Sequence, residues 1–391
     1  MYEESVDLVI VGAGPAGLST ALHLLQQDPD WAGRMLILDK AVHPREKLCG
    51  GGITRPGMAI LQGLGLELEP RHVTVNEVLL RYGSRTYRIH SPPLFHVVHR
   101  AEFDHWLLEQ TEARGTRVRQ GEGVVDVRVE EGRVHVRSER GSYRARALIA
   151  ADGSNSTVKR ALRWNERGRK ARLLEVLTPE DPAARIEYRR GVACFDFDWM
   201  REGLQGYVWD FPSFVDGQAR MNRGVYDSRI RSELPRASLT SILERALSQR
   251  HRDLARCRLR GHPIHWFDPR SRHARPHVLL VGDAAGVDPL FGEGIAFALA
   301  YGQVAAATLQ AAFARDDLGF ADYDAAVLRH PLLRQLAVRA RGAAWVYRLT
   351  RYPGLADRLW RLAPLLFRLF VGIRPDYVPA DEPRLVPVNA D

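Results

Sequence analysis

Glycines and a carboxylate near the N-terminus are the first residues whose spacing could do chemistry. Gly12, Gly14 and Gly17 follow a short β-branched run and precede an apolar helical pattern that opens with Pro15-Ala16. The first glycine permits a tight turn, the second lets a pyrophosphate approach the backbone, and the third lets helix and strand pack closely. Asp39 ends the next apolar run, where an acid would accept hydrogen bonds from an adenosine ribose. The pattern predicts a dinucleotide site.

A second glycine-rich segment, residues 280–295, indicates which dinucleotide binds. Asp283 follows a buried apolar run, and its carboxylate would accept hydrogen bonds from ribityl hydroxyls. Gly292 and Gly294 precede Ile295 at the start of another helix, whose N-terminal amides would face a flavin pyrimidine ring and stabilise negative charge on reduction. The alternative, an ordinary strand–turn–helix with a capping aspartate, leaves the first segment unexplained. The two segments together predict FAD, and therefore redox chemistry.

Cys49 is a candidate reactive residue. A lone cysteine is usually a small core filler. However, it lies in Lys47-Leu-Cys49-Gly50-Gly51-Gly52, and the lysine and glycines favour a loop that touches the cofactor. Two interpretations stay open, a proton donor and a packing residue beside the flavin.

The segment Tyr207-Val-Trp209-Asp-Phe211-Pro212 is a candidate substrate strand. A strand period of two places Tyr207, Trp209 and Phe211 on one face and Val208 with Asp210 on the other. An aromatic wall facing the flavin is one interpretation, and ordinary packing of a sheet is the other.

Several of these segments, taken together, resemble a known group of flavoproteins. The glycine-rich start, Arg100 ahead of Glu-Phe-Asp, Ala151-Asp152-Gly153 and Gly282-Asp-Ala-Ala are similar to the para-hydroxybenzoate-hydroxylase-type superfamily. Within it, residues 47–52, 206–212 and 282–298 resemble the geranylgeranyl reductase family.

The resemblance implies catalytic roles for Cys49, Tyr207 and Trp209, and substrate contacts for Tyr207, Trp209, Phe211 and Pro212. It also implies that Arg100 lies near the FAD phosphates or the ribityl chain. The residues that would bind the cofactor are Gly12, Gly14, Pro15, Ala16, Gly17, Asp39, Lys40, Lys47, Cys49, Gly50, Gly51, Arg100, Asp152, Gly153, Asp283, Pro289, Gly292, Gly294 and Ile295.

Two departures bear on the reaction. Aromatic hydroxylases of the superfamily usually carry histidine and asparagine where this chain has Gly286 and Ile295. A flavin-dependent halogenase would show Trp-x-Trp-x-Ile-Pro, and here Tyr207 replaces the first tryptophan. The substitutions favour reduction, and a monooxygenase or halogenase stays as the alternative.

The elements that must position these residues indicate an α/β fold. Strands are expected over 7–11 and 34–39 with a helix over 15–27 between them, which is a βαβ unit. We expect a discontinuous Rossmann-like FAD-binding domain with an inserted antiparallel sheet on the substrate side and a helical C-terminal segment. The expected boundaries are 1–75, 101–162 and 273–325 for the FAD-binding parts, 76–100 and 163–272 for substrate strands, and 326–391 for a basic helical region.

Charge and composition narrow the partners. The chain has 391 residues, a net charge of +9 and 3 cysteines without metal-ligand spacing, so neither a disulfide framework nor a metal site is expected. Residues 325–375 hold ten arginines against one acid, so this segment alone sums to 10 − 1 = +9. Its leucines and tryptophans recur at helical spacing, which suits a cavity cap with contact to anionic lipid. Nucleic acid fits poorly, because no recognition motif is present.

The sequence therefore predicts an FAD-dependent reductase that saturates double bonds of a polyprenyl chain on a lipid, diphosphate, pigment or quinone. NADPH or a ferredoxin-like partner would supply electrons, because no second nucleotide-binding pattern is visible. A non-catalytic flavin-binding protein at the membrane is the third hypothesis. No leader and no run of 18 apolar residues is seen, so we expect a cytoplasmic protein, peripheral at the inner face of the cell membrane.

Overall fold

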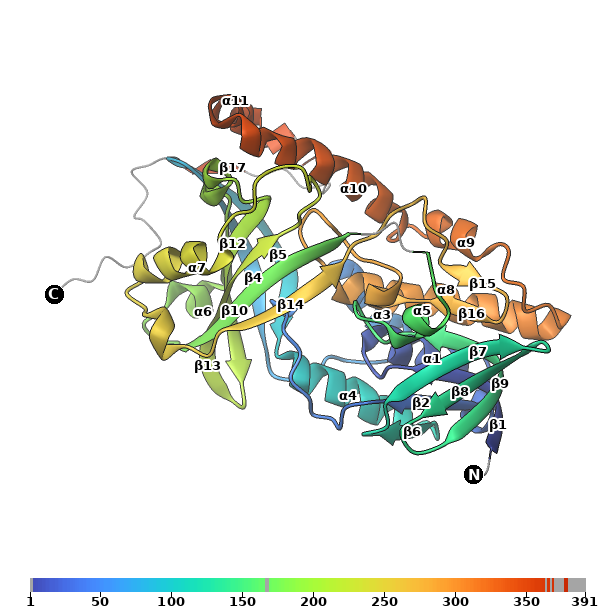
Figure 1. Ribbon diagram of the computed structural model, residues 1–391. Coiled ribbons are helices and arrows are strands. Elements are labelled where there is room, and N and C mark those ends of the chain that lie inside the picture. The colour runs from blue at the N-terminus through green and yellow to red at the C-terminus, as the bar shows by residue number, and fades with distance from the viewer. Residues whose placement is uncertain (1–2, 166–168, 363, 366–367, 369–375, 379–391) are drawn as a thin grey trace.

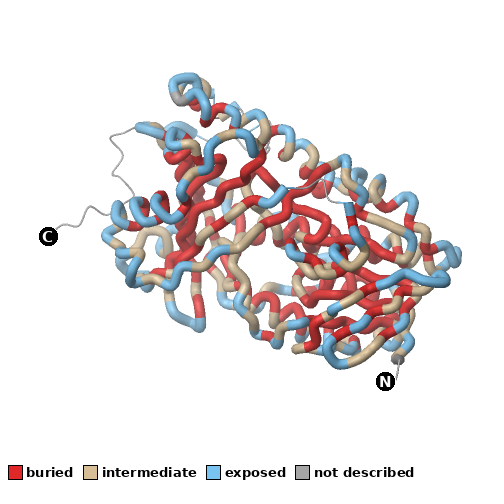
Figure 2. Tube along the Cα trace, viewed as in Figure 1, coloured by how far each residue is buried: buried red, intermediate tan, exposed pale blue. Residues whose placement is uncertain are grey.

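The protein is built on two β-sheets that lie side by side, with helices between and around them (Figure 1). The computed structural model describes residues 3–165, 169–362, 364–365, 368 and 376–378. Parts of the segment expected over 326–391, Arg374 among them, lie outside the described residues. Figure 2 shows that burial is concentrated in the two sheets and that the outer surface of the C-terminal helices is exposed. The α/β class expected from the sequence is confirmed.

The first sheet carries the N-terminal βαβ unit. Its order in the described chain is β15 (Ala274–Arg275), β16 (Val278–Leu280), β9 (Ser142–Ala150), β1 (Glu3–Val11), β2 (Met35–Asp39) and β6 (Arg117–Gln120), with β7 (Val124–Glu130) and β8 (Arg133–Ser138) beyond β9. The pairs β16–β9, β9–β1, β1–β2 and β2–β6 are parallel. Strands buried on both faces must be continuously apolar, and every residue of β2 is buried.

Helices pack against both sheets and form the last long stretch of the described chain before β17. The α-helices are α1 (Pro15–Gln27), α2 (Trp31–Arg34), α3 (Arg55–Gly63), α4 (Arg100–Glu112), α5 (Thr157–Ala161), α6 (Ile186–Arg190), α7 (Leu239–Ser248), α8 (Ile295–Arg315), α9 (Tyr323–Arg329), α10 (Arg334–Val346) and α11 (Pro353–Leu359). Short 3-10 turns are η1 (Asp198–Glu202), η2 (Leu254–Arg256), η3 (Gly282–Ala284), η4 (Tyr347–Arg351) and η5 (Trp360–Leu362).

Helix α8 is a largely buried helix that packs beside the first sheet. Ser19 Oγ of α1 donates to Leu299 O of α8 at 2.8 Å, so the two helices approach closely. By length and composition, α8 is the one described helix that could cross a membrane, yet 72% of its apolar window is buried inside the protein. Its apolar character is accounted for by packing against α1 and α3.

The second sheet is largely antiparallel and draws strands from distant parts of the chain. Its order in the described residues is β14 (Arg260–His265), β10 (Lys170–Pro179), β13 (Gln218–Asp227), β12 (Gly206–Val215), β11 (Val192–Asp196), β4 (His72–Tyr82), β5 (Arg85–Val98) and β17 (Asp376–Val378), with β3 (Gly52–Thr54) on β5. The β11–β4 pair is parallel. Strands from residues 52–98, and β17 near the C-terminus, thus complete the sheet that is otherwise built from residues 170–265.

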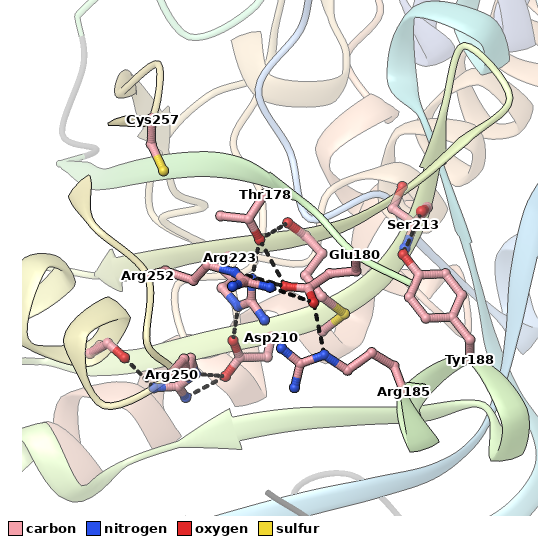
Figure 3. A network of polar contacts seen from close by, with 12 residues as sticks. Thr178, Glu180, Arg185, Tyr188, Asp210, Ser213, Arg223, Arg250, Arg252 and Cys257 are labelled. Carbon is pink, nitrogen blue, oxygen red and sulfur yellow. Dashed lines mark hydrogen bonds and ion pairs between the residues drawn. The ribbon is translucent and has the colours of Figure 1, made fainter. Parts of the chain in front are cut away.

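A buried ion network braces the outer face of the second sheet (Figure 3). Asp210 Oδ1 accepts from Arg223 Nε at 2.9 Å, and its Oδ2 accepts from Arg250 Nε at 2.8 Å. Arg223 Nη1 also donates to Glu180 at 2.8 Å. Burial raises the pKa of Asp210, but the two arginines outweigh that effect and lower it. Through Asp210, the network contacts the face of β12 that is opposite to Trp209.

Candidate functional site

The turn between β1 and α1 uses its glycines in two different ways. Gly12 has φ +109°, and a Cβ there would lie 2.4 Å from Ala151 O, while a Cβ at Gly17 would lie 2.1 Å from Gly12 O. Gly14 has φ −89°, which any residue adopts, and the atom closest to its Cβ would be Arg45 Nη2 at 3.5 Å. The protein's own packing does not require glycine at position 14, so the space beside it fits the approach of a ligand.

Asp39 ties this turn to the loop after β2. Its Oδ2 accepts from the backbone N of Ala13 at 2.6 Å, and its Oδ1 accepts from that of Ala41 at 2.8 Å. Burial raises the pKa of the carboxyl, but the His43 ring 3.9 Å away and the hydrogen bonds from Ala41 and Ala13 outweigh burial and lower it. Asp39 is therefore ionised at neutral pH and keeps lone pairs for a ligand hydroxyl. The neighbouring Lys40 is exposed.

Two arginines converge on Asp104 beside the turn. Arg100, the first residue of α4, donates from Nε and Nη2 to the Asp104 carboxylate at 2.7 and 2.8 Å. Arg45 Nη2 lies 3.0 Å from Asp104 Oδ2. Two cations against one carboxylate leave positive charge next to Gly14, which suits a pyrophosphate. The sequence did not predict Arg45, because nothing in its loop distinguishes it from a surface arginine.

A second polar group surrounds Asp283 at the start of η3. Lys47 Nζ lies 3.8 Å from Asp283 Oδ2 and 2.6 Å from His262 Nε2, and Ser154 Oγ donates to Asp283 at 3.3 Å. Burial, and then the charge of Lys47, lowers the pKa of His262 to about 4. Burial also lowers the pKa of Lys47, against the opposing effect of Asp283. Neutral His262 therefore accepts a hydrogen bond from Lys47 Nζ, and Asp283 stays partly exposed.

The expected pair Asp152-Gly153 follows β9. Asp152 Oδ2 accepts from the backbone N of Thr157 at 2.7 Å and of Val158 at 3.1 Å, so its carboxylate first of all caps α5. Burial raises the pKa of Asp152. Gly153 has φ +79°, and a Cβ there would meet nothing within 4 Å.

The loop between η3 and α8 is held by tyrosine hydroxyls. Each donates to a backbone carbonyl: Tyr301 to Gly286 at 3.1 Å, Tyr226 to Pro289 at 3.0 Å, Tyr347 to Leu290 at 2.6 Å, and Tyr207 to Phe291. Because the carbonyls are occupied by protein donors, the loop has one fixed shape. No side chain caps α8 at Gly294, and a Cβ on that residue would come no closer than 3.9 Å to Asp283 Oδ1. The first amides of α8 are thus open to a ligand, while the Ile295 side chain is buried.

Helix α10 closes this loop from the other side. Arg339, which is buried, donates from Nη1 to Asp288 Oδ2 at 2.8 Å and to Glu293 Oε2 at 2.6 Å. Thr54 Oγ1 donates to the other oxygen of Glu293 at 2.6 Å. Burial lowers the pKa of Arg339, but the two carboxylates outweigh it and raise the pKa above its ordinary value. This arginine of the basic segment is therefore an internal ion-pair partner.

The aromatic residues of β12 form a continuous wall. Tyr207, Trp209 and Phe211 are 5%, 3% and 7% exposed, and the Phe195 ring lies 5.0 Å from Tyr207 and 5.1 Å from Phe211 between centroids. A Cβ on Gly50 would lie 2.9 Å from the Phe211 ring, so the wall directly contacts the loop of Cys49. Pro212, by strand alternation, shares the opposite face with Val208 and Asp210 and is not part of this wall.

The cysteine loop, residues 47–51, is hydrogen-bonded to two strands of the second sheet. Glu175 Oε2 on β10 accepts from Cys49 N at 2.9 Å, and Asn222 Nδ2 on β13 donates to Cys49 O at 2.9 Å. Trp209 Nε1 donates to Asn222 Oδ1 at 2.8 Å. Burial raises the pKa of Glu175 to about 8 despite the bonds from Cys49 and Asn222. Neither Glu175 nor Asn222 was predicted from the sequence.

The site therefore runs from the N-terminal turn, past the arginines and Asp283, to the cysteine loop and the aromatic wall. The sequence is similar to known proteins over most of its length. The family described as FAD binding domain matches residues 5–312. A menaquinone reductase of Mycolicibacterium smegmatis is 30% identical over 338 residues, which cover 77% of this chain and 75% of the relative.

Two further similarities concern geranylgeranyl groups by name. A digeranylgeranylglycerophospholipid reductase of Methanopyrus kandleri is 29% identical over 332 residues, with 80% of this chain and 78% of the relative covered. The structure of a geranylgeranyl bacteriochlorophyll reductase-like protein of Thermoplasma acidophilum shares the fold with TM-score 0.72 at 21% identity, covering 95% of this chain and 100% of that chain. The chain belongs to the FAD binding domain family and is an FAD-dependent oxidoreductase of the geranylgeranyl reductase-like kind.

Proposed function

We propose that this protein uses reduced FAD to saturate carbon–carbon double bonds of a polyprenyl chain. The observation that carries the proposal is the aromatic wall of β12, which meets the cysteine loop at Gly50 with ring carbons. An isoprenoid chain has no polar group except at its head group, so the apolar surface of this aromatic wall suits it. Two of the relatives are named for reductions of digeranylgeranylglycerophospholipid and menaquinone, molecules that carry isoprenoid chains.

The residues along the site fit FAD from end to end. Asp39 would accept from the adenosine ribose, and Arg45 and Arg100 would neutralise the pyrophosphate beside Gly14. Asp283 would accept from the ribityl chain, and the open amides at Gly294 would face the pyrimidine ring. We assign the remaining predicted contacts to the same surface: Gly12, Pro15, Ala16, Gly17, Lys40, Lys47, Cys49, Gly50, Gly51, Asp152, Gly153, Pro289, Gly292 and Ile295.

Bound FAD supplies the hydride equivalent in this reaction. The chain would do the rest: Tyr207, Trp209 and Phe211 hold the alkene and exclude water, and a proton must reach the carbon next to the one that takes the hydride. The Cys49 thiol, which accepts a bond from Gly51 N at 3.4 Å, is one group placed to hold that proton. The other interpretation of Cys49, as a packing residue beside the flavin, predicts that solvent supplies the proton.

We propose NADPH or a ferredoxin-like protein as the electron source, reacting transiently at the same flavin. The head group would be a phospholipid, a diphosphate, a pigment or a quinone, and it would lie away from the aromatic wall.

We further propose that the C-terminal helices place the cytoplasmic protein against anionic lipid. Bulky apolar side chains between 46% and 63% exposed lie among exposed arginines on these helices. The exposed set is Arg334, Val338, Arg341, Trp345, Arg348, Arg351, Tyr352, Leu355, Arg358, Arg361, Leu362, Leu365 and Arg368. Arginine and tryptophan together suit an anionic interface, where a polyprenyl substrate would reside.

An anaerobic single-turnover experiment tests the reductase. The purified protein, with its flavin quantified by absorbance, is reduced without oxygen and mixed with geranylgeranyl lipid in deuterium oxide. We expect flavin reoxidation together with a lipid in which one double bond per reduced flavin is saturated and carries solvent deuterium. Turnover only with oxygen, giving an oxygenated or halogenated product, would support the monooxygenase or halogenase instead. Bound flavin with neither reaction would favour the non-catalytic hypothesis, and protein without FAD would defeat both enzymatic ones.

A further inference from the structure

One buried side-chain amide connects the cysteine loop with the aromatic wall of β12. Asn222 on β13 is 5% exposed. Its Nδ2 donates to Cys49 O at 2.9 Å, and its Oδ1 accepts from Trp209 Nε1 at 2.8 Å. The side chain therefore bridges the cysteine loop, which belongs to the N-terminal part of the chain, and the aromatic wall of β12.

The orientation of this amide is determined by chemistry. The Trp209 indole is a donor only, and the Cys49 carbonyl is an acceptor only, so the oxygen of Asn222 must face the indole and its nitrogen must face the carbonyl. A flipped amide would lose both bonds. Glu175 holds the other side of the same residue by accepting from Cys49 N at 2.9 Å, and both peptide polar groups of Cys49 are thus fixed by the second sheet.

We propose that Asn222 is a positioning residue that couples the Cys49 loop to the Trp209 indole, with Glu175 supporting the same loop. The consequence for catalysis rests on the proposed function, whereas the coupling itself concerns only contacts within the chain. With Asn222 in place, a displacement of the indole is transmitted to Cys49. Without it, the Glu175 bond and the Gly50–Phe211 contact still hold the loop, but the Trp209 indole is no longer connected to Cys49.

The alkylation rate of the Cys49 thiol by iodoacetamide measures this coupling without any turnover. The rate is read from the Cys49 peptide by mass spectrometry, in flavin-loaded protein, so Cys194 and Cys257 do not interfere. We expect N222A to raise the rate about tenfold, because a loop that has lost a buried hydrogen bond opens more often. N222L, which has a similar volume, should do the same, since its side chain can neither accept from the indole nor donate to Cys49.

Gln205→Ala is the matched control. Gln205 is also a buried amide near the second sheet, and it bonds to Arg231 O at 3.0 Å and to Arg231 N at 2.8 Å. Q205A should lower thermal stability comparably to N222A and leave the Cys49 alkylation rate unchanged.

A double-mutant cycle gives the decisive result. W209F removes the indole donor and keeps a ring, so it should raise the Cys49 alkylation rate about threefold in the wild type and have no effect in N222A. The proposal is overturned if N222L alkylates at the wild-type rate, or if W209F acts equally in both backgrounds. Activity on geranylgeranyl lipid is measured separately, so failure of the reductase assay leaves the coupling result standing.

Discussion

At the scale of single residues, Gly14 separates a requirement of the ligand from a requirement of the fold. G14A places a methyl group in open space at an ordinary φ, so we expect the apo-protein to melt as the wild type does. The same methyl group would obstruct the pyrophosphate and weaken FAD binding by at least about tenfold. Titration of apo-protein with FAD, followed by quenching of flavin fluorescence, measures the affinity.

The matched control is G17A, in which the new Cβ would lie 2.1 Å from Gly12 O. That variant should lose stability first and FAD only as a consequence. Equal melting temperatures for G17A and wild type, or unchanged FAD affinity in G14A, would contradict this division of the two glycines.

Glu175 gives a pH dependence of stability with a definite sign. The unfolded carboxyl ionises near 4.5, but in the folded protein burial keeps it neutral up to a pKa of about 8. Folding therefore binds a proton between these values, and this contribution to stability is complete below about pH 4.5 and falls as pH rises toward 8. E175Q keeps an acceptor for Cys49 N and cannot ionise. Its melting temperature should exceed that of the wild type by a margin that grows from pH 5 to 8 and then levels off; a constant margin would refute the shift.

The residues that sequence could predict are those whose function follows from neighbours along the chain. Gly12, Gly14 and Gly17 lie within one turn, so their spacing is sufficient evidence. Asn222 is different, because it lies 173 residues from Cys49 in the sequence and meets it only in the folded chain. No local pattern encodes that contact.

At the scale of elements, the ion network of Figure 3 holds β12 in place from the side away from the aromatic wall. D210A would leave Arg250 and one side of Arg223 buried without a carboxylate. We expect a loss of about 3–5 kcal/mol in the free energy of unfolding, measured with urea. The control is E202A, whose exposed pair with Arg245 should contribute no more than about 1 kcal/mol. Equal losses for both variants would show that the buried network does not stabilise β12.

Element types were predictable where the apolar period was clear. The helix expected over 15–27 is α1, and the strand expected over 34–39 is β2. The alternation in residues 207–211 correctly placed the three aromatic rings on one face. Sequence did not show that Asp210, on the other face, would find Arg223 and Arg250, because ion pairs between separated strands and loops leave no periodic trace.

At the scale of the whole molecule, the discontinuous chain path explains both the success and the limit of sequence analysis. Two glycine-rich segments far apart predicted one cofactor, because both follow strands that meet in the first sheet. The second sheet was harder to predict: β3 was not expected, because it precedes most of the sheet by about a hundred residues and joins it only through tertiary pairing with β5. Likewise, the basic segment gave no sign that Arg339 would be internal.

The surface of α10, η4, α11 and η5 allows a test of the whole protein against a membrane. The triple variant R341E/R348E/R351E reverses three exposed charges, and each arginine near an anionic surface contributes about 1 kcal/mol, so binding to vesicles with anionic lipid should fall at least a hundredfold. Wild-type protein should cosediment with those vesicles, should dissociate from them when salt is added, and should not bind neutral vesicles. The control is the triple variant R128E/R137E/R140E, on and beside β7 and β8 of the first sheet. It changes the net charge equally but leaves the C-terminal surface intact. Equal losses from both triple variants would reduce the interaction to net charge alone and remove the C-terminal helices as the docking surface.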